Sequence, residues 1–157
     1  MKEFFAKYLK RGQLKKQKPQ YKQIEYQIKR AQRDLKTARL LVEADPEWAI
    51  TVAYHAMLRA GRALLFSHGY LPADGAQHKT VVELTGSILG NDYKRLVQQF
   101  ERMRRKRNIF FYESFESTTV TEAKSSLKTA ADMQERIRSA IEDALPQLKL
   151  TFEDVSK

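Results

Sequence analysis

Apolar residues recur at spacings of three and four along most of this 157-residue chain, and that pattern restricts it to a helical fold. The stripes are longest in residues 20–44, 46–68 and 120–145. Each stripe is typical of one face of an amphipathic helix that packs against a core. Six glycines and four prolines are also few for a β-rich chain, which needs many turns. The sequence therefore predicts an all-α fold, an up-and-down bundle of four to five helices in which strands are not needed.

Turn and cap residues indicate where the expected helices begin and end. Asp45-Pro46 is typical of a helix start, with aspartate as the N-cap and proline at the first helical position. Gly69 is expected to end that helix, and residues 70–77 form the clearest loop. A short helix is expected at 78–89 and a further long helix at 92–113. The chain length fits one domain with a core. We expect three parts: a basic arm or short helix at 1–19, the helical bundle at 20–146 and a tail at 147–157.

The charge balance points to an anionic partner. Lysine and arginine number 29 against 19 acidic residues, a formal net charge of +10. This excess favours nucleic acid, a nucleotide or an acidic protein as the partner. The segment 1–19 is the most basic part, with Glu3 as its only acid. We expect it to pack loosely or to dock on a partner or an acidic surface; the alternative is a frayed, solvated terminus.

Other features of the composition bear on location. The chain has no cysteine, which excludes disulfides and thiolate metal sites and fits a reducing compartment. No run of about 18 apolar residues is present, so no membrane-spanning helix is expected. The first residues lack the apolar centre of a secretory signal. We therefore expect a cytoplasmic protein that does not bind a membrane.

The segment from Phe100 to Glu113 is the most informative for function. If it is helical, Leu96, Phe100, Met103 and Phe110 form an apolar stripe whose missing step falls on Arg107. Charged side chains are rarely buried unless they are paired or used. Arg107 is thus expected either to face an interface or to extend its charged head into water.

Further basic and polar residues surround this position. They are Arg102, Arg104, Arg105 and Lys106 before Arg107, and Asn108 and Tyr112 after it. Such a helix could contact phosphates, although the spacing of a helix-turn-helix DNA reader is not present. On the preceding helix, His55, Arg59 and Arg62 share one side, at spacings of four and three.

Several enzyme classes lack their required residues here. The three histidines, His55, His68 and His78, form no metal-binding pair such as H-E-x-x-H, and no metal site is expected. No phosphate-binding glycine loop and no nucleophile-elbow serine occur. We accordingly expect no cofactor.

Two segments resemble the HEPN-domain family. Residues 53–65 read AYHAMLRAGRALL and are similar to its second conserved helix, followed by Tyr70, a loop and His78. Residues 107–112 read RNIFFY, where the family has its R-N-x-x-x-H signature. The resemblance covers about residues 20–145. It implies a four- to five-helix bundle that forms a homodimer, with the signature arginines of both chains meeting in a cleft. Active members cleave RNA there without a metal ion, often in toxin–antitoxin or other defence systems.

The chain departs from this signature at one position, because Tyr112 stands where the family has histidine. A phenol with a pKa of about 10 is a poor general base at neutral pH. Catalysis would need a lowered Tyr112 pKa or a substitute base, His55 or His78. Of these two, His55 is the better candidate because it is expected beside Arg59 on a core helix. The competing interpretation is a histidine packed between helices.

Three hypotheses follow. The first is a HEPN-like module that binds RNA or nucleotide at Arg107 and Asn108, with weak or no catalysis. For it the expected catalytic-type positions are Arg107, Asn108 and Tyr112, and the expected binding residues are Arg102, Arg104, Arg105, Lys106, Arg107, His55 and Arg59. The second is an active metal-independent endoribonuclease controlled by a nucleotidyltransferase-type partner. The third is a structural adaptor whose basic surface meets an acidic protein.

Overall fold

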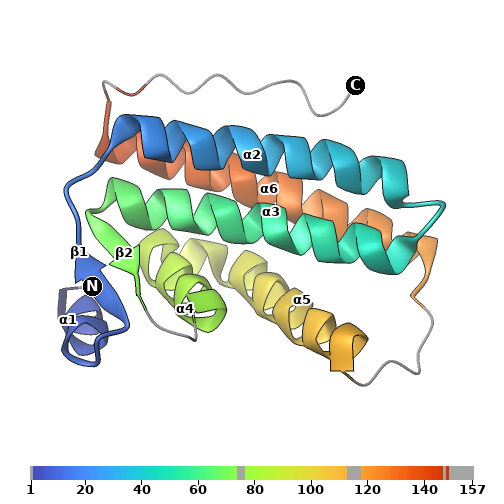
Figure 1. Cartoon of the computed structure of the whole chain (residues 1–157), viewed down its shortest axis with the longest axis horizontal. Helices are drawn as coiled ribbons and strands as arrows, with labels where there is room; N and C mark the ends of the chain where they lie inside the picture. Colours follow the sequence, from blue (N-terminus) through green and yellow to red (C-terminus); the bar gives the residue numbers. More distant parts are fainter. Residues whose placement is uncertain (1, 74–76, 113–117, 147, 149–157) are drawn as a thin grey trace.

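The computed structural model describes residues 2–73, 77–112, 118–146 and 148, and at 109–112 it describes the helical backbone only. These residues form six α-helices and two short strands (Figure 1). The elements are α1 (Lys2–Lys10), β1 (Leu14–Lys16), α2 (Tyr21–Leu41), α3 (Pro46–Ser67), β2 (Tyr70–Pro72), α4 (Gln77–Leu89), a 3-10 turn (Asn91–Tyr93), α5 (Lys94–Tyr112) and α6 (Val120–Ala144). The predicted all-α fold is confirmed. No helix among the described residues combines the length and apolarity needed to cross a membrane.

Helix α3 lies at the centre of the bundle and contacts α2, α4, α5 and α6. Figure 1 shows α2, α3 and α6 as long helices running alongside one another, with α4 and α5 below them. Small residues allow these close contacts. A Cβ atom added at Gly61 would lie 2.7 Å from Val81 Cγ1 and 2.8 Å from Thr85 Oγ1 of α4. Both neighbours are β-branched and stiff at χ1, so α4 can pack this close only against glycine. This contact holds α4 close against α3.

The predicted start of α3 is confirmed. The Asp45 side chain accepts a hydrogen bond of 3.0 Å from the backbone N–H of Trp48, and Pro46 is the first helical residue. Gly69 follows the helix with a φ of +82°, which glycine adopts without a steric cost. The chain then turns directly into β2, so the position of β2 depends on this cap.

The two strands differ from the expectation that no strands are needed. Leu14 pairs with Pro72 and Lys16 with Tyr70 in an antiparallel ladder, so part of the expected arm meets part of the expected loop. Three-residue strands are too short to show an alternating pattern, and their partners are far apart in the sequence. The pairing attaches α1 and β1 to the bundle, and the arm is therefore a packed part of the fold.

Candidate phosphate-binding site

The predicted apolar stripe positions α5 on the core. Phe100 is fully buried and Met103 is nearly so, while Leu96 is half-buried. The ring of Phe100 packs against that of Tyr54 on α3, with 5.8 Å between the centroids. Phe110 lies in α5, but its side chain is outside the described residues. The contact with Tyr54 sets which face of α5 is turned toward α3.

Arg107 is half-buried rather than extended into solvent. One of its terminal nitrogens, Nη1, donates a hydrogen bond of 3.4 Å to the Oδ1 atom of Asn108. Its positive charge acts on three rings from other helices: it helps to lower the pKa values of His55 and His78, and it opposes the rise that burial causes in the pKa of Tyr54. Of the two alternatives for Arg107, the structure shows a side chain that faces polar groups of α3 and α4.

Those three rings form one polar group. The hydroxyl of Tyr54 and Nδ1 of His78 are hydrogen-bonded at 3.0 Å. The rings of His55 and His78 meet edge to face, with 6.0 Å between their centroids. Two histidines that were candidates for a substitute base therefore lie together beside Arg107.

The environment keeps both histidines neutral. Burial is the main cause that lowers the pKa of His78, to about 4, and the charges of Arg107, Arg62 and Arg104 lower it further. Burial and Arg107 also lower the pKa of His55, while Asp34 opposes the shift. Burial raises the pKa of Tyr54, so its phenol stays protonated. At neutral pH the site thus contains neutral rings surrounded by arginines.

Three arginines converge on these rings, Arg62, Arg104 and Arg107, and we call them the arginine cluster. Arg62 donates to the neutral side-chain oxygen of Gln77. Its Nε atom is buried and has no hydrogen-bond partner among the described residues. An unsatisfied buried guanidinium N–H is costly, so an anion that accepted from it would be favoured.

Carboxylates neutralise only part of this charge. Glu101 accepts from Arg104 at 2.7 Å and from Arg105 at 3.1 Å. Arg59 forms an ion pair of 2.9 Å with Asp34, which also faces Arg30. The ion pair with Asp34 leaves Arg59 less charge to offer a ligand than sequence analysis assumed.

The remaining predicted binding residues point in different directions. Lys106 bonds to Glu122 of α6, Arg105 and Arg102 are exposed, and only Arg104 joins Arg107 beside the histidines. Tyr112 ends α5, and its side chain lies outside the described residues. The structure brings together Arg107, Arg104, Asn108 and His55 from the predicted set.

Sequence analysis did not assign Tyr54, Arg62 and Gln77 to the site. A signal was present, since Tyr54, His55, Arg59 and Arg62 are polar residues within an otherwise apolar helix. Polar groups inside a core need partners. His78 was a candidate through the family resemblance, but no sequence signal showed that the start of α4 would place Gln77 against Arg62. Within the described part of the chain, no three His, Asp or Glu side chains are grouped as a metal ion would require.

The titration of His78 gives a direct check of this geometry. Its folded pKa of about 4 lies below the unfolded value of 6.5, so the unfolded chain binds more protons between these values. The free energy of unfolding should therefore fall as the pH drops from about 6.5 to about 4. The loss should stay well under the roughly 1.4 kcal/mol per pKa unit of a buried group, because solvent screens this half-exposed ring. NMR titration of the histidine Cε1–H signals, assigned with His78→Gln, measures the pKa of His78. A midpoint near 6.5 would contradict the described environment.

Comparison with known proteins adds one finding. The family model of the HEPN domain matches residues 24–140, from α2 to near the end of α6. The matched range contains the arginine cluster, both histidines and Tyr54. No curated protein matches the chain.

Proposed function

Because the chain belongs to the HEPN-domain family, we propose that its arginine cluster binds a phosphate group of RNA or of a nucleotide, with weak or no catalysis. The observation that carries this proposal is that Arg62 and Arg107 lie near both neutral rings, His55 and His78, and that Arg104 lies near His78 as well. Guanidinium groups match phosphate oxygens with paired N–H donors, and their positive charge does not depend on pH. A phosphate would reduce the mutual repulsion of these cations.

The groups around the arginine cluster favour a bound anion over a bound cation. Among the arginine cluster, Arg104 has Glu101 as a carboxylate partner, whereas Arg62 donates to the neutral amide of Gln77. The buried Nε–H of Arg62 offers a further donor. A bound phosphate would also raise the pKa of His78, since an added negative charge favours the imidazolium.

A second copy of the chain is the protein partner that the proposal includes. Arg107 and Asn108 are half-buried near the C-terminal end of α5, so another chain could approach both. The arginines of two copies would then face one shared phosphate cleft. Sedimentation equilibrium measures the oligomeric state directly. A monomer that binds RNA with full affinity would contradict the proposed dimer.

Binding itself is tested by titrating a fluorescently labelled single-stranded RNA with the protein and following anisotropy at several salt concentrations. We expect affinity to fall steeply as salt rises, because phosphate binding releases counterions. Absence of binding at about 50 mM salt would contradict the proposal and favour the adaptor, whose packed protein interface need not depend on salt.

A second candidate function, metal-independent RNA cleavage, has its own supporting observation. His55 and His78 lie 6.0 Å apart at the arginine cluster, and a neutral imidazole can accept the proton of a 2′-hydroxyl. That oxygen would attack the phosphorus, the bond to the 5′-oxygen would break, and arginine would stabilise the added negative charge. These roles would supply the base that Tyr112 cannot.

Cleavage is expected to persist in chelator if this second function holds. His55→Gln or His78→Gln, whichever removes the base, should then lower the rate by about 100-fold or more, whereas Tyr112→Phe should change it little. RNA that stays intact in chelator and in magnesium would leave the binding function alone. Cleavage lost with Tyr112→Phe but kept with His78→Gln would assign the base to the phenol instead.

A further inference from the structure

The N-terminal region carries charge that the proposed site does not use. We define the basic arm as residues 2–18, which comprise α1, β1 and the chain around them. It precedes the matched HEPN range, which begins at residue 24. Seven lysine and arginine side chains face one acid, Glu3, giving a net charge of +6 out of the total of +10. Most of the chain's excess positive charge is thus on a small added element.

The basic arm is held in a fixed position on the domain. Phe5, Tyr8 and Leu14 are buried, and the ring of Phe5 stacks on Tyr70 with 4.5 Å between centroids. The Tyr8 hydroxyl donates to the carboxylate of Glu83 on α4. The antiparallel pairing of β1 with β2 attaches the arm to the strand that follows α3. A ligand that binds here would meet ordered cations and would not have to order the backbone itself.

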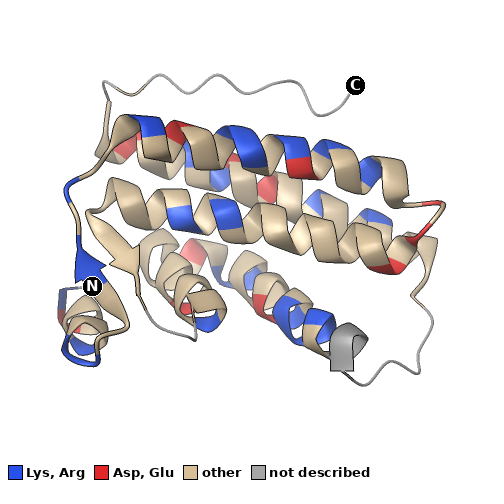
Figure 2. Cartoon of the chain, in the orientation of Figure 1, with Lys and Arg blue, Asp and Glu red and all other residues tan. Residues whose placement is uncertain are grey.

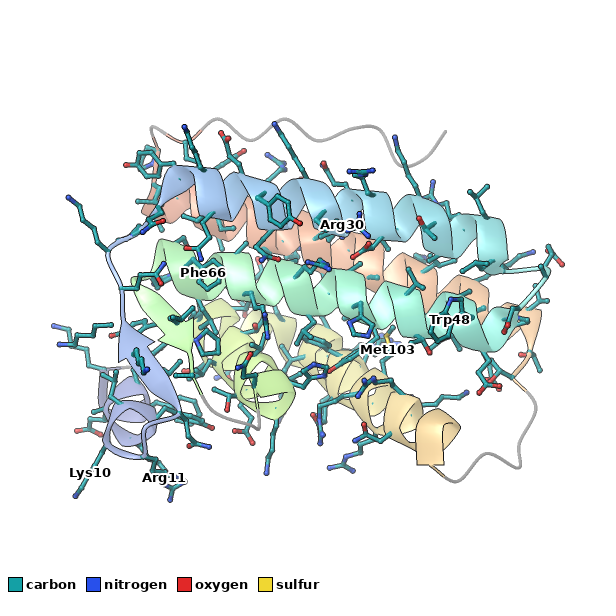
Figure 3. The ribbon with its side chains drawn as sticks, in the orientation of Figure 1. Lys10, Arg11, Arg30, Trp48, Phe66 and Met103 are labelled. Carbon is teal, nitrogen blue, oxygen red and sulfur yellow. The ribbon has the colours of Figure 1, made fainter. Side chains whose placement is uncertain are left out.

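Its cations remain available to a ligand. All seven are exposed, and none forms an ion pair with a described residue. Lys7, Lys10 and Arg11 lie at helical spacings of three and four, which puts them on one face. Figure 3 shows Lys10 and Arg11 pointing away from the rest of the molecule. The seven residues are Lys2, Lys7, Lys10, Arg11, Lys15, Lys16 and Lys18.

A groove between α4 and α5 is lined by residues that contact the basic arm and the arginine cluster. It has a volume of about 550 Å³, and three cations, Lys79, Lys94 and Arg105, lie along it. Glu83 pairs with Lys79 and Glu101 with Arg105. One wall includes Glu83, which holds Tyr8 of the arm. Another includes Glu101, the partner of Arg104. Figure 2 shows Lys and Arg on the arm, on α4 and on α5, along the lower side of the molecule.

The geometry points to a polynucleotide as the ligand: a single-stranded RNA whose backbone runs from the arginine cluster, along the α4–α5 groove, to the basic arm. This inference rests on the proposed function and narrows its ligand class, since a mononucleotide occupies the cluster alone. Cations spaced along a fixed surface suit the repeated phosphates of a chain. The basic arm then adds affinity that depends on RNA length.

The basic arm suits nucleic acid better than a membrane surface. Membrane-bound amphipathic helices insert an apolar face between lipids. In α1 that face is occupied, because Phe5 and Tyr8 are buried against the domain. Phe4 is the large apolar residue that α1 leaves exposed, beside the cations Lys2, Lys7 and Lys10. A phosphate backbone can neutralise such cations one by one.

The experiment compares binding of a mononucleotide and of a single-stranded RNA of about 16 nucleotides, near the upper site size of small single-strand binders. The arm variant is Lys7→Gln/Lys10→Gln/Arg11→Gln. The matched control, Lys22→Gln/Lys29→Gln/Arg33→Gln, removes the same charge from exposed positions of α2, at the upper side of Figure 2. Arg107→Ala tests the arginine cluster in parallel. Circular dichroism melts check that each variant is folded.

The arm variant should bind the long RNA roughly tenfold or more weakly, and its salt slope should fall by about 2, from about 0.7 per lost contact. Its mononucleotide affinity should equal that of the wild type, as should both affinities of the α2 control. Unchanged affinity and slope of the arm variant, with a loss in Arg107→Ala, would overturn the inference and leave the proposed function standing. A loss of RNA affinity in the arm variant, with no loss in Arg107→Ala, would contradict the proposed site. It would also contradict the RNA path that starts there. Equal losses in the arm variant and the α2 control would mean a general charge effect and would also overturn the inference.

Discussion

Arg107→Ala is expected to weaken the binding of single-stranded RNA by roughly 10- to 100-fold, the value of a charge-assisted hydrogen bond of about 1.5–3 kcal/mol. Within the arginine cluster, Arg107 has the largest electrostatic effect on each of the three rings of the site. Its removal takes away a phosphate donor and also lowers the local positive charge. The RNA affinity of Arg107→Lys should lie between those of the wild type and Arg107→Ala, because lysine keeps the charge but lacks the paired N–H donors.

The matched control for this result is Arg95→Ala. Arg95 is an exposed arginine of the same helix, about three turns before Arg107, and it does not line the α4–α5 groove. Loss of its charge should change affinity by less than about threefold at moderate salt, because exposed charges at a distance are screened. If Arg95→Ala and Arg107→Ala reduced binding equally, the contribution would be general electrostatic attraction and not a site.

The part of the fold that could be read from the sequence is the part that rests on local patterns. The apolar stripes of α2, α3 and α6 gave a helical bundle because a spacing of three and four identifies a buried face without knowledge of the partner. Asp45-Pro46 marked the start of α3 because capping involves only neighbouring residues. Arg107 was found in the same way, as a charged residue interrupting an apolar stripe.

What could not be predicted depends on contacts between distant segments. Lys16 pairs with Tyr70, and Tyr8 bonds to Glu83. The sequence around Lys16 and Tyr8 contains no pattern that predicts these partners. The same holds for His78, which meets Tyr54 only because α4 packs closely at Gly61. Sequence analysis preferred His55 to His78 for proximity to Arg59, yet the structure places the two rings side by side.

Ion pairs within the basic helix were also hidden. Arg102, Arg104, Arg105 and Lys106 look equivalent as a run of cations, and sequence analysis grouped them. In the structure Glu101 pairs with Arg104 and Arg105, and Glu122 pairs with Lys106. Which cations remain to bind a ligand follows from the helix faces and from α6, so a count of charges overestimates the binding surface.

Phe100→Ala is expected to lower the free energy of unfolding by about 3–5 kcal/mol, the range for removing a large buried aromatic side chain. Phe100 is fully buried between α5 and α3, where it contacts Tyr54. It and Met103 are the fully or nearly buried apolar side chains of α5 among the described residues, with Leu96 and Val97 partly buried beside them. The variant should also bind RNA weakly, because Arg104 and Arg107 depend on the position of α5.

Urea denaturation measures the global effect, and amide hydrogen exchange shows whether α5 opens separately from the rest. The control is Phe4→Ala, since Phe4 is 37% exposed on α1 and its loss should cost under about 1 kcal/mol. Similar losses for both variants would mean that α5 is not anchored at Phe100. Faster exchange confined to α5, with the midpoint of urea unfolding little changed, would mean that α5 detaches while α2, α3 and α6 stay folded. In that case the proposed phosphate-binding site would be the least stable part of the bundle, since it is assembled from α5 and the helices on which α5 packs.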